Sequence, residues 1–224
     1  MPVITIRGKM GSGAPEIGKK LAERLQIDYI DRETIAGVAA RLNIQEQELA
    51  AKETPPCSLR ERIEEALQRG YATGVGVQGA YLPISQIPLD DNRYLEALSS
   101  FFKDLAQGHS AVIYGRGSQY ILRDNPKTVN VSIVAPFKVR LKRVMESMNI
   151  NEERAKQEIS RFDNSAREFI KRFFGAEMED PTCYDLVLST ERLSYDSAAS
   201  IILESLRIKR DEVAAAKALS TTSP

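Results

Sequence analysis

The chain alternates between short apolar runs and longer stretches in which apolar residues recur with helical spacing. The short runs predict strands at residues 2–7, 27–30, 110–115, 129–134 and 184–189. The longer stretches predict helices at residues 15–25, 34–42, 43–53, 59–69, 93–107, 137–148, 151–174 and from 196 to 208 or beyond. Strands that alternate with helices are typical of a parallel sheet covered on both faces. The pattern therefore predicts a three-layer α/β fold with a five-stranded parallel sheet.

A glycine-rich turn after the first strand is a candidate binding site. Gly8 and Gly13 occupy the two glycine positions of the phosphate-binding pattern G-x-x-x-x-G-K-[ST], with Gly11 between them. Glycines let backbone N–H groups converge on an anion, and the helix that follows adds the positive end of its dipole. The lysine and hydroxyl positions of the pattern hold Ala14 and Pro15. The turn is thus predicted to bind phosphate without the usual lysine, and a tight turn without a ligand is the alternative interpretation.

A second match to the pattern begins at Gly13 and ends at Gly18 and Lys19. Pro15 favours the first turn of a helix, and the apolar residues after it recur at fourfold spacing. Gly18 and Lys19 are therefore expected inside that helix, with the lysine directed away from the turn. The frame that starts at Gly8 is preferred, because a strand precedes it and a helix follows it.

Other polar motifs also follow predicted strands. Ligands of open parallel sheets bind outside the carboxyl ends of the strands. In this chain those ends bring together Gly8–Gly13, Asp31–Arg32, Gly115–Arg116 and Ser189. This convergence supports each motif more than its letters alone do. A glycine- and proline-rich run at 70–91 is predicted to be a long loop, and loops of this length inside a domain are usually functional or mobile.

Composition and charge limit the classes of partner. The 224 residues carry 31 basic and 31 acidic side chains, so the net charge gives no signal for nucleic acid or for an anionic membrane. The sequence has no run of about eighteen apolar residues and no signal-peptide pattern before the first strand, which predicts a cytoplasmic protein. Cys57 and Cys183 lie far apart and His109 is the single histidine, which argues against a zinc site and a histidine-based triad.

Five motifs, taken in order, are similar to those of one protein family. They are Gly11-Ser12-Gly13-x-x-Glu16-Ile17-Gly18-Lys19-Lys20-Leu21-Ala22, Tyr29-x-Asp31-Arg32-Glu33, Val112-Ile113-x-Gly115-Arg116-Gly117, Asp163-x-x-x-Arg167 and Asp180-Pro181-x-x-Tyr184-Asp185-Leu186-Val187-Leu188. Together they resemble the cytidylate kinase-like family, a divergent branch of the P-loop nucleoside monophosphate kinases. The resemblance implies a fold of the P-loop NTPase type. Its kinase core would comprise residues 1–33, 109–144 and 176–224, with a helical insert for the nucleoside monophosphate at 34–108 and a lid at 145–175.

The resemblance also implies an ATP site and a phosphoryl acceptor. The candidate ATP-binding residues are Gly8, Gly11, Ser12, Gly13, Ala14, Pro15 and Glu16. The candidate catalytic cations are Lys9, which would replace the missing loop lysine, Arg116 and Arg167. The candidate substrate-binding residues are Asp31, Arg32, Arg116, Arg161 and Asp163.

Each of these candidates also has a structural interpretation. Asp31 can cap a helix, and Arg116 can be an ordinary surface charge. Asp163 and Arg167 have the i,i+4 spacing of a pair on a solvated helix face.

Two positions depart from the family pattern. Typical cytidylate kinases have a lysine in the loop and an acidic residue after Gly-Arg, where this chain has Ala14 and Gly117. The lost lysine would have placed a cation beside the β- and γ-phosphates, where it helps to stabilise the transition state. Pro15 has no hydroxyl, so Mg²⁺ would take Ser12 or Glu16 as a ligand.

The predicted function is transfer of the γ-phosphoryl group of ATP to a nucleoside monophosphate. Nucleic acid and membranes are not expected partners. Two alternatives stay open at the level of sequence. One is a P-loop module that binds nucleotide or phosphate without catalysis and acts as a sensor or interaction partner, and the other is a kinase of a different small molecule.

Overall fold

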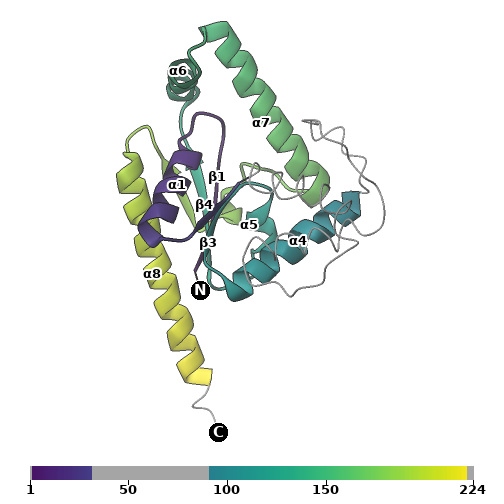
Figure 1. The fold of residues 1–224 in the computed structure, drawn as a ribbon, viewed down its shortest axis with the longest axis vertical. Helices are drawn as coiled ribbons and strands as arrows, with labels where there is room; N and C mark the ends of the chain where they lie inside the picture. Colours follow the sequence, from purple (N-terminus) through teal and green to yellow (C-terminus); the bar gives the residue numbers. More distant parts are fainter. Residues whose placement is uncertain (1, 32–90, 221–224) are drawn as a thin grey trace, which may run out of the picture.

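The computed structural model describes residues 2–31 and 91–220, and Figure 1 shows their arrangement. Five parallel strands form one sheet in the order β2-β3-β1-β4-β5. The strands are β1 (Val3–Gly8), β2 (Asp28–Ile30), β3 (Ala111–Tyr114), β4 (Thr128–Val134) and β5 (Leu186–Ser189). All five predicted strands are confirmed, with ends that differ from the prediction by at most two residues.

Helices cover both faces of this sheet, as the sequence predicts (Figure 1). The helices are α1 (Ala14–Leu25), α4 (Asp91–Gly108), α5 (Ser118–Ile121), α6 (Phe137–Met148), α7 (Glu152–Phe174) and α8 (Tyr195–Ser220), with a short 3-10 turn at Pro181–Cys183. In this part of the chain no helix is long and apolar enough to cross a membrane. The architecture is the three-layer fold of the P-loop NTPase type.

The core has two layers because successive strand residues point to opposite faces. Ile4 and Ile6 pack with Ile17 and Leu21 of α1 and with Ile202 of α8, and all five side chains are almost fully buried. On the other face, Val3 and Ile113 pack with residues of α4, α5 and the second half of α7. The two layers fix the carboxyl ends of β1, β3 and β4 next to one another.

Helices α6 and α7 form a pair beside the carboxyl edge of the sheet (Figure 1). Asn151 caps α7, and its side chain accepts a hydrogen bond from the N–H of Arg154 at 3.0 Å. The first half of α7 packs on α6 through Ala155 and Ile159, whereas the second half joins the sheet layer. The division of the chain into core, insert and lid stays a prediction.

The structure corrects some boundaries. The helix predicted at 93–107 is slightly longer in the structure, where α4 begins at Asp91 and ends at Gly108, and the N–H of His109 donates to the carbonyl of Leu105 at 2.8 Å. Helix α5 was not predicted, because its four residues are too few for a helical period. The predicted helices at 34–42, 43–53 and 59–69 lie outside the described residues, as does the predicted loop at 70–91 apart from its last residue.

Candidate phosphate-binding site

The turn between β1 and α1 has the geometry of an anion-binding loop. Gly11 and Gly13 have φ angles of +77° and +89°, in the left-handed region that glycine adopts without a steric penalty. The N–H of Ser12 donates to the carbonyl of Lys9 at 3.0 Å and closes the turn. Gly13 is the N-cap of α1, so the loop leads directly into the positive end of a helix dipole.

The preferred reading frame of the loop is confirmed. Helix α1 starts at Ala14, with Pro15 in its first turn, and it contains Gly18 and Lys19. The Lys19 ammonium lies 5.9 Å from the centre of the Tyr29 ring. Lys19 therefore belongs to the body of the helix and cannot act as the loop lysine.

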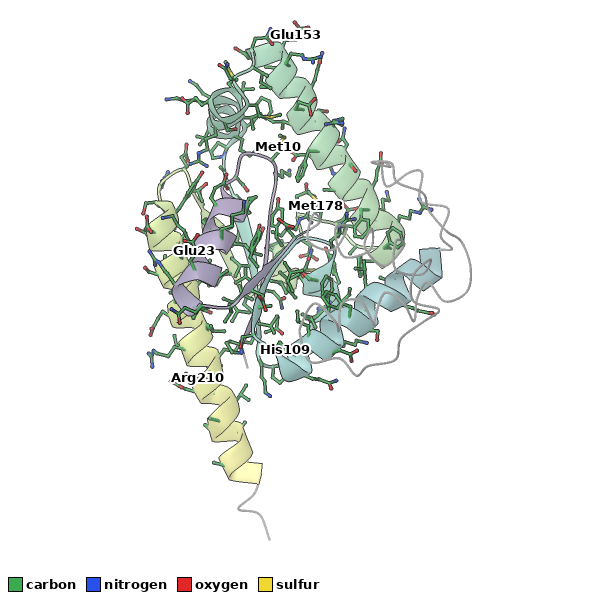
Figure 2. All side chains as sticks on the ribbon, in the orientation of Figure 1. Met10, Glu23, His109, Glu153, Met178 and Arg210 are labelled. Atoms are coloured by element: carbon green, nitrogen blue, oxygen red, sulfur yellow. The ribbon has the colours of Figure 1, made fainter. Side chains whose placement is uncertain are left out.

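Two arginines of α6 hold the carbonyl groups of the loop. Arg140 Nη1 donates to the carbonyl of Met10 at 2.9 Å. Arg143 Nη1 lies 3.2 Å from the carbonyl oxygen of Gly11 and 3.4 Å from that of Ser12. Figure 2 labels Met10 at the tip of the loop, beside the α6 and α7 pair. Sequence reasoning did not select either arginine for the site.

These contacts set the direction of the loop N–H groups. In a trans peptide the C=O of one residue and the N–H of the next point in opposite directions. Because α6 holds the carbonyls of Met10 and Ser12, the N–H groups of Gly11 and Gly13 are directed away from α6. Within the described part of the chain, neither of these N–H groups nor that of Ala14 has a hydrogen-bond partner. The loop is therefore prepared to accept an anion.

The side chain of Ser12 is turned into the loop. Its hydroxyl is fully buried and has no hydrogen-bond partner within residues 2–31 and 91–220, and a Cβ on Gly8 would lie 2.2 Å from Ser12 Oγ. Ser12 is thus unsuited to bind Mg²⁺ in this arrangement. Magnesium in nucleotide sites needs only one or two protein carboxylates besides phosphate and water. Glu16, exposed in the first turn of α1, is the candidate of this kind in the loop region.

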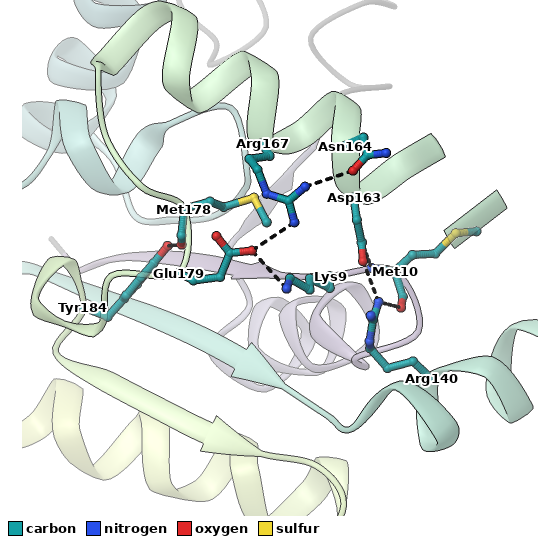
Figure 3. A network of polar contacts seen from close by, with 9 residues as sticks. All are labelled: Lys9, Met10, Arg140, Asp163, Asn164, Arg167, Met178, Glu179 and Tyr184. Carbon is teal, nitrogen blue, oxygen red and sulfur yellow. Dashed lines mark hydrogen bonds and ion pairs between the residues drawn. The ribbon is translucent and has the colours of Figure 1, made fainter. Parts of the chain in front are cut away.

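Asp163 on α7 connects the loop to the α6 and α7 pair (Figure 3). Its Oδ1 accepts the N–H of Met10 at 3.0 Å, and its Oδ2 accepts Arg140 Nη1 at 2.8 Å. The Asp163 and Arg140 side chains are only 10% and 8% exposed. Both carboxylate oxygens of Asp163 therefore bind the protein itself, and its role as a substrate ligand stays a prediction.

Lys9 and Arg167, two of the predicted catalytic cations, meet at one carboxylate (Figure 3). Lys9 Nζ lies 2.9 Å from Glu179 Oε1, and Arg167 Nη2 lies 3.5 Å from the same oxygen. Burial alone would raise the pKa of Glu179, but the hydrogen bond from Lys9 and the charges of Lys9 and Arg167 outweigh it and hold that pKa below its usual value. Arg167 Nη1 also donates to Asn164 Oδ1 at 2.9 Å. Sequence reasoning missed Glu179, although it directly precedes the Asp180-Pro181 motif.

The remaining arginine candidates differ in position. Arg116 follows β3 with a φ of +57°, and its guanidinium lies 5.7 Å from the centre of the Phe169 ring on α7. Arg161 is 80% exposed and pairs with Glu158 on its own helix at 2.7 Å. The structure thus brings Arg116 to the strand edge and leaves Arg161 in a local surface pair. Arg32 lies outside the described residues.

The hydroxyl of Tyr114 lies at the end of β3, and the charges of several acidic candidates influence its pKa. Burial raises the pKa of Tyr114 to about 12, and the positive charge of Arg7 opposes that increase. The carboxylates of Glu16, Asp163 and Asp31 raise the pKa further. These three carboxylates come from α1, from α7 and from the residue after β2.

Arg7, the residue before the loop, is an unexpected buried cation. It is 7% exposed, and its Nη1 atom has no hydrogen-bond partner among the described residues. No carboxylate in the described part of the chain pairs with it. Burial raises the pKa of Tyr184, and the positive charge of Arg7 partly offsets that increase.

The strand order and the arginine-bordered glycine loop define a P-loop fold of the kinase type. Residues 3–192 match the model of the cytidylate kinase-like family, and the chain belongs to that family. Family and fold together support a nucleotide or small-molecule kinase. The sequence resemblance to this family is therefore confirmed.

Individual relatives agree with this assignment. A cytidylate kinase of Staphylothermus marinus is 24% identical over 204 residues, which cover 91% of this chain and 96% of that protein. An uncharacterized protein from Eubacterium ventriosum has a solved structure with a TM-score of 0.66 and 20% identity, covering 92% of this chain and 99% of that one. A gluconokinase from Sinorhizobium meliloti superimposes with a TM-score of 0.50 and 13% identity over 95% of both chains. At these identities the structural matches show the fold alone.

Proposed function

We propose that this protein is a nucleotide kinase of the cytidylate kinase type, which transfers the γ-phosphoryl group of ATP to a nucleoside monophosphate. In the proposed reaction, an oxygen of the acceptor phosphate forms a bond to the γ-phosphorus, the bond to the β–γ bridging oxygen breaks, and ADP leaves. The observation that carries the proposal is the orientation of the Gly11 and Gly13 N–H groups away from the carbonyls held by α6. Membership of the family supports the nucleotide acceptor.

Cations beside the loop would stabilise the transferred group. Phosphoryl transfer involves little covalent chemistry by the protein, so catalysis depends on positioning and on positive charge. Lys9 is proposed to supply the charge that Ala14 cannot, and Arg167 is proposed to close over the phosphates from α7. Glu16 would be the protein ligand of Mg²⁺, which would supply positive charge that neutralises part of the charge of the phosphates.

The acceptor is proposed to bind on the β2 and β3 side of the loop. Arg116, at the end of β3, would contact the acceptor phosphate, because a guanidinium presents several donors to phosphate oxygens. Asp31 and Arg32 would contact the remainder of the acceptor. Asp31 already influences the pKa of Tyr114, which is consistent with a position near the same strand edge.

A nucleotide-binding protein without transfer activity is the second candidate. Ala14 has no amine and Pro15 has neither a hydroxyl nor an N–H, so two groups that usually contact the triphosphate are missing from the loop. The anion cradle is independent of both groups, because it is formed by glycine N–H groups. Binding could therefore persist after catalysis was lost.

An assay of ADP release separates these candidates. The purified protein is given ATP and Mg²⁺ with each nucleoside monophosphate and with a panel of small hydroxylated metabolites, and the ATP-dependent shift in melting temperature is measured in parallel. Release of ADP that requires a monophosphate supports the proposal. Turnover only with another metabolite would assign a small-molecule kinase, and a melting shift without turnover on any acceptor would assign the binding module. If the protein shows neither a melting shift nor turnover, all three candidate functions are excluded.

Replacement of Lys9 tests its catalytic role. Lys9→Ala is expected to lower the turnover number by at least about tenfold, because a cation at the transferring phosphoryl group contributes several kcal/mol to catalysis in comparable sites. Lys20→Ala is the matched control, since Lys20 is similarly exposed but pairs with Asp196 at 3.1 Å on the other side of α1. Equal turnover by the Lys9→Ala variant and the wild type would exclude Lys9 as the replacement for the loop lysine.

A further inference from the structure

Two carboxylates contact the residues of the phosphate loop, and their surroundings differ. Asp163 is 10% exposed and uses both oxygens in hydrogen bonds to Met10 and Arg140. Glu179 is 44% exposed and contacts Lys9 and Arg167, which are 35% and 42% exposed. A buried carboxylate with hydrogen bonds to both oxygens is a permanent part of the fold. An exposed ion pair contributes little to stability, and other anions readily replace its carboxylate.

The contacts of Glu179 resemble those that a phosphate oxygen would make. A single oxygen, Oε1, lies within reach of both the Lys9 ammonium and the Arg167 guanidinium (Figure 3). The arginine contact is long, at 3.5 Å, so the Nη2 group is only weakly satisfied. Two cations and one carboxylate leave the cluster with one positive charge in excess. The cluster therefore still attracts an anion of higher charge.

Glu179 is placed so that its side chain can leave without unfolding its segment. The neighbouring residue Met178 is buried, and its carbonyl accepts the hydroxyl of Tyr184 at 3.0 Å. On the other side, Asp180 Oδ1 accepts the N–H of Thr182 at 2.9 Å. The backbone on both sides of Glu179 is thus held, while rotation about its side-chain bonds can release the carboxylate into solvent.

We propose that Glu179 is an internal competitor for the ligand's phosphate, occupying the space between Lys9 and Arg167 until a phosphate displaces it. This inference rests on the proposed function, because it takes both cations to be phosphate ligands. If a phosphate with two negative charges joined the cluster while Glu179 stayed, three negative charges would face two positive ones. Like charges at such distances repel, so the carboxylate leaves when the phosphate binds. The affinity of the site for phosphate is then set partly by the strength of the Glu179 contacts.

The test compares two carboxylate replacements on the same segment. Glu179→Gln removes the competing charge and keeps the shape of the side chain. Glu177→Gln removes an equal charge two residues away from an exposed side chain that makes no contact with either cation. Dissociation constants for pyrophosphate and for ATP are measured by calorimetry at fixed ionic strength, with melting temperatures as a control for folding.

The expected result is that Glu179→Gln tightens pyrophosphate binding by about fivefold, the factor that corresponds to an exposed ion pair. Glu177→Gln is expected to change it by less than about twofold, because its charge is screened by solvent. Weaker binding by Glu179→Gln would overturn the inference, since it would mean that Glu179 positions Lys9 for the ligand. Equal tightening by both variants, or no pyrophosphate binding by either of them or by the wild type, would also overturn it.

The ADP-release assay keeps this inference separate from the proposed function. Tighter pyrophosphate binding by Glu179→Gln without ATP-dependent transfer on any acceptor would support the competitor role and remove the kinase proposal. Transfer by the wild type, together with unchanged pyrophosphate affinity in Glu179→Gln, would support the kinase proposal and remove the competitor role.

Discussion

Replacement of Asp163 by alanine is expected to destabilise the fold by about 3–5 kcal/mol, the cost of leaving one member of a buried ion pair without its partner. Asp163 and Arg140 are 10% and 8% exposed, and their atoms lie 2.8 Å apart. The alanine variant would leave a buried guanidinium whose Nε atom already has no hydrogen-bond partner in the part of the chain that the structure describes. The N–H of Met10 would also lose its acceptor, which lies at 3.0 Å. Both losses act in the same direction.

A second ion pair on the same helix provides the control. Glu158 and Arg161 lie 2.7 Å apart, a separation close to that of Asp163 and Arg140, but Arg161 is 80% exposed. Glu158→Ala is therefore expected to change the free energy of unfolding by at most about 1 kcal/mol. The two variants place alanine in α7 and differ chiefly in the burial of the pair that they break. The difference between them measures the effect of burial.

Urea unfolding followed by circular dichroism measures these free energies. The double variant Asp163→Ala with Arg140→Met is expected to recover part of the loss, because it leaves no unpaired charge in the interior. A loss below about 1 kcal/mol for Asp163→Ala would refute the expectation that breaking the buried Asp163–Arg140 pair strongly destabilises the fold. A double variant that is less stable than Asp163→Ala would refute the explanation through the unpaired arginine.

Two further predictions concern the loop and the end of β3. Gly13→Ala is expected to lower the melting temperature more than Gly175→Ala. Both glycines have a positive φ, but a Cβ at Gly13 would lie 2.4 Å from the Tyr195 ring, whereas a Cβ at Gly175 would meet no described atom within 4 Å. Equal losses would show that the ring moves aside freely. Because folding raises the pKa of Tyr114 from 10.0 to about 12, its contribution to stability is complete below pH 10 and is lost as the pH rises toward 12. Unfolding measured over this pH range should show the wild type losing more stability than Tyr114→Phe, and parallel losses would contradict the raised pKa.

Local signals in the sequence were sufficient for most of the fold. Helix α6 begins and ends at the predicted residues, because Pro136 precedes its first turn and Asn149 ends it in a left-handed conformation. The strands were predictable because apolar runs are bounded by glycine or charged residues. Helix α5 escaped prediction, since a four-residue helix that follows the left-handed Gly117 has no period to detect. Helix α4 extends beyond the predicted range 93–107 by two residues at its start and one at its end, a difference of the size by which helix ends commonly vary.

The candidate site was only partly predictable, for a different physical reason. The loop and the strand ends could be located because parallel topology places them at one edge. The partners of Lys9 and Met10 could not, because Glu179 and Asp163 lie more than 150 residues further along the chain. Arg7 also escaped, since a charge within an apolar run is usually assigned to a strand end exposed to solvent. Such contacts depend on how α7 packs against the loop, which hydrophobic spacing does not encode.

The backbone donors of the loop and the positive charge beside it are held in place by different residues. Orientation of its N–H groups depends on the α6 arginines, which hold the carbonyls on the opposite side of the same peptide planes. Positive charge beside the loop comes from Lys9 and Arg167, which are held by Glu179 in the ligand-free chain. A substitution in α6 should therefore weaken every anion alike, because it disturbs the N–H groups that all anions would use. A substitution at Lys9 should instead act most strongly on the transition state, where charge builds up on the transferred group. The absence of a lysine at position 14 is thus compatible with binding, and under the proposed function the catalytic charge comes from Lys9 inside the loop and from Arg167 on α7.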